Sequence, residues 1–268
     1  MAITTIDGAI AGMRPPEDIL KVGATMEAIG VHHSLMYTSG RPGAAAANGQ
    51  ALAGAALTSY AGQIPFVNPG SGNSYLARLA AQSSGAGVLL LCDRLWHNDT
   101  IAETTTTGQT INSVAWPARD RDGSTNGEGI LVGLEVSTAT TNAGAITNTT
   151  LTYTNQSGAG SKTATMASFP ATAVAGTFVP FQLAAGDTGI RSIQTLTLGT
   201  SYGGGTIHLV AYRILARLEL TAANIGNSVD VVSGGFVRMF DNTVPFLIWL
   251  PTATTAVTVG GQLIVTQG

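Results

Sequence analysis

Short apolar runs separated by clusters of Gly, Asn, Asp and Pro dominate the chain from about residue 85 onward. Runs of this length with such boundaries are typical of β-strands. The pattern predicts the following strands: Val88–Trp96, Thr110–Trp116, Ile130–Val136, Ile146–Thr154, Ser161–Ala167, Thr177–Leu183, Ile190–Leu198, Thr206–Leu218, Phe236–Phe240, Val244–Leu250 and Ala256–Thr266.

Alternation between apolar and polar residues supports this interpretation most clearly in the run TIHLVAYRILARLEL. There, Ile214, Ala216 and Leu218 fall on one side and Arg213 and Arg217 on the other, as in a half-buried strand. Many strands at short spacing, without helices alternating between them, favour antiparallel β architectures over βαβ units. We therefore expect a mainly β protein with a β-sandwich or jelly-roll-like domain.

The first 65 residues have a different pattern and predict an N-terminal arm that contains a short helix. Pro15-Pro16-Glu17-Asp18 has the composition of a helix start, because proline fits the first turn and acidic residues suit its positive end. The helix predicted after it has an approximately helical apolar stripe: Ile19, Leu20, Val22, Met26 and Ile29.

The segment 40–63 that follows is rich in Gly and Ala. It fits an extended arm, a loop that lies over a neighbour, or a short Ala-rich helix. We divide the chain into an arm at residues 1–65 and a β-sandwich domain at residues 66–268.

Charge is unusually sparse for a soluble chain. Asp, Glu, Lys and Arg make up 10% of the residues, against about 25% in an average domain, and 34 of the 268 residues are Gly. A protein held in an assembly needs less charge for solubility than a free monomer, so the composition favours an assembled protein. An uncharged, Gly- and Thr-rich sandwich outside any assembly is an equally good reading.

The same composition argues against several classes of partner. The net charge is −3, the pI is about 5.7 and no basic run occurs, which excludes a typical nucleic-acid-binding surface. No apolar run reaches the roughly 20 residues that a membrane-spanning helix needs. One cysteine and no visible secretory signal are consistent with synthesis in a reducing cytoplasm.

The run VLLLCDRLWHND contains the only cysteine and is the best candidate for a catalytic centre. If it forms one strand, Cys92, Arg94 and Trp96 lie on one face, and Asp93 and His97 on the other. Cys92 and His97 then point apart and cannot form a thiolate–imidazolium pair. We interpret Cys92 as a buried core thiol.

Other motifs indicate no metal and no cofactor. The loop ARDRDGSTNGEG at residues 118–129 has carboxylates in a Gly-rich setting, but it departs from the EF-hand pattern. A solvated turn is favoured there over a weak cation site. Adjacent His32 and His33 point in divergent directions in extended chain, and SYGGGT (201–206) lacks the residues of a phosphate-binding loop. With no catalytic constellation, a non-enzymatic protein is expected.

Several segments resemble a group of tailed-bacteriophage virion proteins: MRPPEDILKVG, YAGQIPFVNP, LLLCDRLWHND, WPARDRDGSTNGEG and FQLAAGDTGIRSIQTLTLGTSYGGGTIHLVAYRILARLEL. The similarity runs along nearly the whole chain, although the group has no catalytic motif to transfer. The resemblance implies a structural protein of the virion, assembled in the cytoplasm of the host bacterium.

Within a virion, a capsid decoration (cement) protein fits best. Its partners would be the major capsid protein and neighbouring copies of itself, most simply as a trimer, with no nucleic acid and no membrane. Bulky residues outside the predicted strands are candidate anchors on a partner: Leu35, Met36, Tyr37, Tyr60 and Phe66. Alternatively, each caps the core of its own chain. A tail-tube, baseplate or receptor-binding component is the alternative role.

Overall fold

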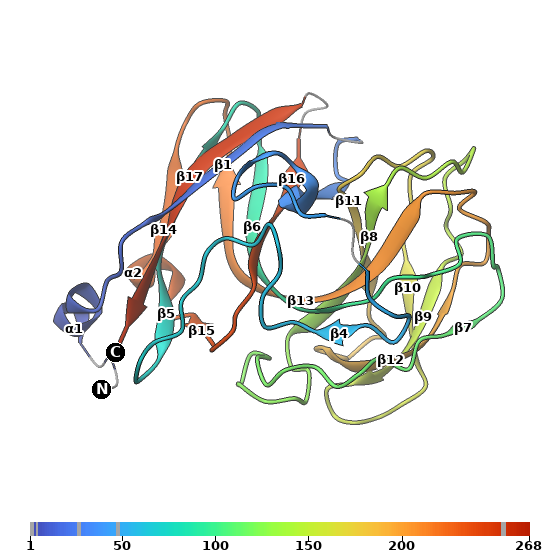
Figure 1. Cartoon of the computed structure of the whole chain (residues 1–268), viewed down its shortest axis with the longest axis horizontal. Helices are drawn as coiled ribbons and strands as arrows, with labels where there is room; N and C mark the ends of the chain where they lie inside the picture. The colour runs from blue at the N-terminus through green and yellow to red at the C-terminus, as the bar shows by residue number, and fades with distance from the viewer. Residues whose placement is uncertain (1–2, 4, 26–27, 47–48, 253–255) are drawn as a thin grey trace.

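Two antiparallel sheets make up the protein, as the computed structural model shows (Figure 1). The model describes residues 3, 5–25, 28–46, 49–252 and 256–268. The first sheet has the order β14 (Asn227–Asp230), β5 (Ser74–Ser83), β17 (Val257–Gln267), β1 (Glu17–Ala24) and β3 (Gly40–Arg41), and β15 (Arg238–Met239) also pairs with β5.

The second sheet contains a closed barrel. Its order is β2 (His32–Ser34), β16 (Pro245–Pro251), β6 (Gly87–His97), β13 (Thr206–Leu220), β8 (Ile130–Thr138), β11 (Thr177–Gln182), β10 (Lys162–Met166), β9 (Thr150–Asn155), β12 (Ile190–Thr197) and β7 (Gln109–Thr110). β4 (Ala55–Ala56) adds to β6. Because β2 also pairs with β11, the strands from β2 to β11 form a closed ring.

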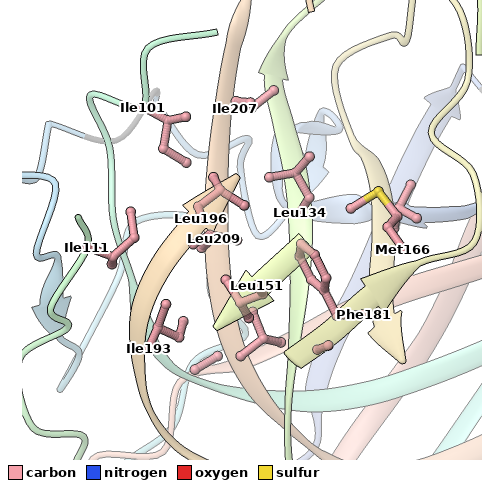
Figure 2. Close-up of a cluster of buried hydrophobic side chains, with 14 of the residues drawn as sticks. Ile101, Ile111, Leu134, Leu151, Met166, Phe181, Ile193, Leu196, Ile207 and Leu209 are labelled. Atoms are coloured by element: carbon pink, nitrogen blue, oxygen red, sulfur yellow. The ribbon is translucent and has the colours of Figure 1, made fainter. Parts of the chain in front are cut away.

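Three groups of buried side chains stabilise this arrangement. The first core lies between β8, β13 and the strands β9, β10 and β12, and includes Leu134, Leu151, Phe181 and Leu209 (Figure 2). The second core joins the first sheet to β6, β13 and β16. The barrel core fills the interior of the ring and includes Cys92, Phe178, Tyr212 and Phe246.

The mainly β prediction is confirmed, and the strands predicted in the second half of the chain lie close to the observed ones. The prediction at Thr110–Trp116 was wrong beyond its first residue, since only Gln109–Thr110 is a strand. The predicted set also missed β5, whose composition of small and polar residues gives little apolar signal although it lies between β14 and β17.

The helix predicted after Pro15-Pro16 was wrong, because residues Glu17–Ala24 form β1. Burial there alternates with a period of two: Ile19 and Lys21 are buried while Val22 is exposed. Pairing with β17 satisfies the backbone of β1, which outweighs the weak helical stripe. Met26, part of that stripe, lies outside the described residues. The short N-terminal helix is instead α1 (Ile6–Ala11), capped by the Thr5 side chain.

The Gly- and Ala-rich segment lies on the barrel of its own chain. Ala45 donates a backbone hydrogen bond to Met36, and the Asn98 amide donates one to the carbonyl of Leu52. β4 pairs with β6 near its end. Apart from the short strands β3 and β4, its described residues therefore form a loop packed on this chain, with no helix. The strands β1 to β4 all precede residue 66 and join both sheets, while the domain division itself stays a prediction.

Candidate functional site

A β-bulge changes which residues share a face in β6. Arg94 pairs with Tyr212 and Trp96 with Ala211, so Leu95 is an extra residue without a partner in β13. A bulge of this kind reverses the alternation of the side chains that follow it. His97 therefore lies on the same side of β6 as Cys92 and Arg94, so its predicted place on the opposite face was wrong.

Arg94 and Glu135 form an ion pair inside the barrel. Arg94 Nη1 lies 2.9 Å from Glu135 Oε1 and Nη2 lies 2.6 Å from Oε2, with both side chains fully buried. Burial by itself would raise the pKa of Glu135, but the charge and hydrogen bonds of Arg94 outweigh it and hold that pKa below its ordinary value. The Tyr37 hydroxyl donates a further hydrogen bond to Glu135.

The hydrogen bond to Arg94 determines the protonation of His97. Arg94 Nε donates to His97 Nδ1 over 3.0 Å, so Nδ1 must be unprotonated and the imidazole carries its proton on Nε2. Burial, with the adjacent positive charge, lowers the pKa of His97 to about 2. The ring meets Tyr60 edge to face at 4.7 Å. His97 is therefore a neutral structural group and an ineffective general base near neutral pH.

Cys92 lies in the barrel core and is completely buried. Burial, together with the nearby charge of Asp93, raises the pKa of its thiol well above the ordinary value. A nucleophilic cysteine requires a thiolate that is stabilised and accessible. The geometry at Cys92 is that of a packed core side chain, in agreement with the sequence-based interpretation.

Asp93 forms a second buried ion pair on the opposite side of β6. Arg119 Nε and Nη2 donate to its two carboxylate oxygens over 3.0 and 3.1 Å. Arg119 also donates to the carbonyl of Leu57, and Val244 N donates to Asp93. This pair therefore ties β6 to three distant segments. The sequence analysis did not identify Arg119 as the partner of Asp93 or Glu135 as the partner of Arg94. The available signal was that these charged residues lie inside or beside apolar runs.

His208 and His33 are also buried. His208 Nε2 lies 2.6 Å from Ser137 Oγ, and Nδ1 lies 3.1 Å from the carbonyl of Asn98. Burial lowers the pKa of His33 to about 4. No group of three or more His, Cys, Asp or Glu that could hold a metal occurs within the described part of the chain.

The loop at residues 118–129 is organised around Asp120. Its carboxylate accepts hydrogen bonds from the backbone of Asp122, Ser124, Gly127 and Glu128 and from the Ser124 hydroxyl. Burial would raise the pKa of Asp120, but these hydrogen bonds outweigh it and lower the pKa. Because donors already occupy this carboxylate, the arrangement favours the turn over a cation site.

The candidate anchors lie against their own chain to different extents. Leu35 and Met36 are each 1% exposed and belong to the second core and the barrel core. Tyr37, Tyr60 and Phe66 are half-buried and pack on the edges of these cores. Only the last three present surface to a partner, and partner binding by the five residues stays a prediction.

The outer face of the first sheet contains a groove of about 740 Å³, named here the outer groove. Small residues of β5 and β17 contribute to its lining, among them Ala80 and Gly260. Its polar lining includes Arg78 and an ion pair between Asp18 and Arg41. No local sequence pattern marks this surface, because its residues come from five strands, β1, β3, β5, β14 and β17.

Apolar side chains are also exposed close to this sheet. Ile6 and Ile10 of α1 are 61% and 58% exposed, and Met13 beyond it is 43% exposed. These side chains lie at a spacing of four and three residues, so those of α1 share one side of the helix. None of the helices among the described residues has the length and apolarity to cross a bilayer.

Comparison with known proteins yields only distant matches. No protein-family model and no curated protein matches the chain. Among solved structures, infectious bursal disease virus Gt strain matches with a TM-score of 0.17 and 16% identity, over 76% of this chain and 47% of that chain. The VP2 subviral particle of infectious bursal disease virus matches with a TM-score of 0.16 and 13% identity, over 76% and 46%.

The chain spans about half the length of the viral proteins it matches. TM-scores this low do not establish a common fold, so these matches carry no argument about function. What the coordinates define is a class of architecture: an antiparallel β-sandwich joined to a small closed barrel.

Proposed function

We propose that this protein is a non-enzymatic structural component of a tailed-phage virion. In this proposal it is a capsid decoration (cement) protein that binds the major capsid protein and neighbouring copies of itself, as a trimer. The virion assignment is supported by the resemblance of its sequence segments to tailed-phage virion proteins. The role in binding is supported by surface features of the fold.

The observation that carries the proposal is the combination of the outer groove with the exposed apolar side of α1. Exposed apolar side chains beside an uncovered sheet face are typical of a surface that binds another protein. Such a role needs no catalytic residues. A surface with few charges costs little to desolvate when it is buried in an assembly.

Antibody labelling of intact virions, viewed by electron microscopy, tests the proposal. Label distributed over the head supports a decoration role. Label confined to the tail contradicts it and favours a tail-tube, baseplate or receptor-binding component. Absence of the protein from purified particles would refute a virion role altogether.

A further inference from the structure

Gly260 lies in the middle of β17, where a glycine is unfavourable unless something approaches closely. Its backbone does not adopt a positive φ, and a methyl group there would lie 4.0 Å from its nearest neighbours, Ile19 O and Leu20 Cδ1. The fold of this chain therefore accommodates a side chain at Gly260. Its absence leaves the outer groove open to another molecule.

The helix α1, in contrast, exposes apolar side chains that its own chain does not cover. Only Ala9 is buried within it, whereas Ile6 and Ile10 are more than half exposed. The helix lies at the edge of the molecule, beside both chain ends (Figure 1). Two branched side chains on a short helix fit the part of the groove where the small residues Ala80, Gly260 and Gly261 lie among polar residues.

Charge complements this shape. Arg78 in the groove is exposed, and its side chain makes one long hydrogen bond, 3.5 Å, to Ser228. Its charge also acts on Asp230, the residue that pairs with Arg78 in β14. The one charged residue within α1 is Asp7, adjacent to Ile6 and three residues before Ile10. A helix that enters the groove with its apolar side brings the carboxylate of Asp7 toward the guanidinium of Arg78.

The α1 of the same chain is held away from the part of the groove around Gly260. Hydrogen bonds hold it at the far end of β17, where the Thr266 hydroxyl donates to Ala9 O and Gln267 N donates to Gly12 O. Gly260 is six residues further along the strand, or roughly 20 Å at about 3.3 Å per residue. A second copy of the chain is thus the source of a helix that fits.

We propose that α1 of one copy binds in the outer groove of a neighbouring copy, an inference that rests on the proposed homo-oligomeric role. The two surfaces differ, so the contact is head-to-tail. Such contacts generate a ring when the rotation between copies closes, which is compatible with a trimer. Ile6 and Ile10 contribute the apolar contact, and Asp7 with Arg78 determines its orientation.

Disulfide trapping between two variants of the full chain, each with one added cysteine, tests this contact. Ile10→Cys and Gly260→Cys are made separately, with a mass tag on one of them, mixed and oxidised; Cys92 is buried and does not compete. A covalent dimer of one tagged and one untagged chain is expected. Dimers of like chains alone, or no covalent dimer, would overturn the proposal.

Charge reversal gives a second measurement with its own control. Arg78→Glu and Asp7→Arg are each expected to weaken self-association at least tenfold in sedimentation velocity, and the double variant is expected to restore it. Ile29→Asp, at an equally exposed apolar residue outside the groove, serves as the control and should associate normally. Normal association of both single variants would contradict the proposed contact.

These results separate the contact from the proposed function. An oligomer that forms without a link between residues 10 and 260 refutes the α1 contact and leaves the homo-oligomeric role intact. A protein absent from virions refutes the virion role, whatever the trapping shows.

Discussion

Two neighbouring charges on β6, Asp93 and Arg94, connect segments that are far apart in the chain. Arg94 holds Glu135 of β8 inside the barrel, and Asp93 holds Arg119 from the loop before β8. Fully buried ion pairs contribute modest net stability, but removal of one partner leaves an uncompensated charge. These residues therefore make the core sensitive to substitution.

Arg94→Met is expected to destabilise the protein by about 3–5 kcal/mol, because it leaves the Glu135 carboxylate buried without its partner. Denaturant unfolding measures the loss. The matched control, Arg217→Met, removes an exposed pair with Glu219 and should cost about 0–1 kcal/mol. The double variant Arg94→Met, Glu135→Leu should recover most of the stability. Equal effects of the two single variants would contradict this account.

Lys21 gives the protein a pH dependence above neutrality. Its ammonium group donates to the carbonyls of Thr38 and Pro42, and burial lowers its pKa from 10.5 to about 8. The unfolded chain therefore retains the Lys21 proton to higher pH than the folded protein does. The free energy of unfolding therefore rises with pH between the folded-state and unfolded-state pKa values of Lys21. Below the folded-state pKa, Lys21 causes no such rise.

Unfolding measured from about pH 7 to about pH 10 checks this expectation. Lys21→Met should lose the part of the rise that Lys21 causes. Lys162 is the other lysine of the chain, and Lys162→Met should retain that rise. Identical pH profiles for the two variants would show that Lys21 titrates as an ordinary surface lysine.

At the scale of elements, the strands β1 and β2 decide how the N-terminal region behaves. β1 pairs with β17 along most of its length, and β2 closes the barrel between β16 and β11. Both strands come from the region predicted as an arm. Weak local patterns are overridden here, because backbone pairing and burial depend on strands that lie far away in the chain.

Deletion of residues 1–65 is expected to abolish cooperative unfolding, since it opens the barrel and exposes one edge of β17. Deletion of residues 1–11, which removes only α1 and the residues before it, should leave the fold intact. Circular dichroism and thermal unfolding of the two truncated proteins distinguish these cases. A folded fragment 66–268 would instead support the two-domain division predicted from the sequence.

At the scale of the whole molecule, β6 and β13 unite the three cores. Along β13, Leu209 faces the first core, Val210 and Tyr212 face the barrel core, and Leu215 and Leu218 face the second core. Ordinary alternation separates Leu209 from Val210, and a bulge at Leu215 changes the side of the residues that follow it. The cores consequently share their central strands and are expected to unfold together.

Leu209→Ala and Leu218→Ala test this coupling from opposite ends of β13. Each removes a buried side chain and should cost about 2–5 kcal/mol. Both variants should retain one transition, coincident by tryptophan fluorescence and far-UV circular dichroism. Val114→Ala, at a partly exposed residue, is the control and should change little. Separate transitions in either variant would show that the cores are independent.

The sequence alone determined the β class and the position of most strands after residue 85, because apolar runs with turn residues at their ends are a local signal. It also identified Cys92 as a core thiol. The sequence did not predict that Asp93 and Arg94 are buried as ion pairs, because their partners Arg119 and Glu135 are distant in the chain.

Only the tertiary structure decided the features that depend on long-range pairing. Residues Glu17–Ala24, which were expected to be helical, form a strand because β17 offers hydrogen-bond partners to their backbone. The tertiary structure placed His97 beside Arg94, because the extra residue Leu95 interrupts the regular alternation of side chains along β6. It also assembled the outer groove from separate strands. In each case a contact across the fold outweighed the local preference of the chain.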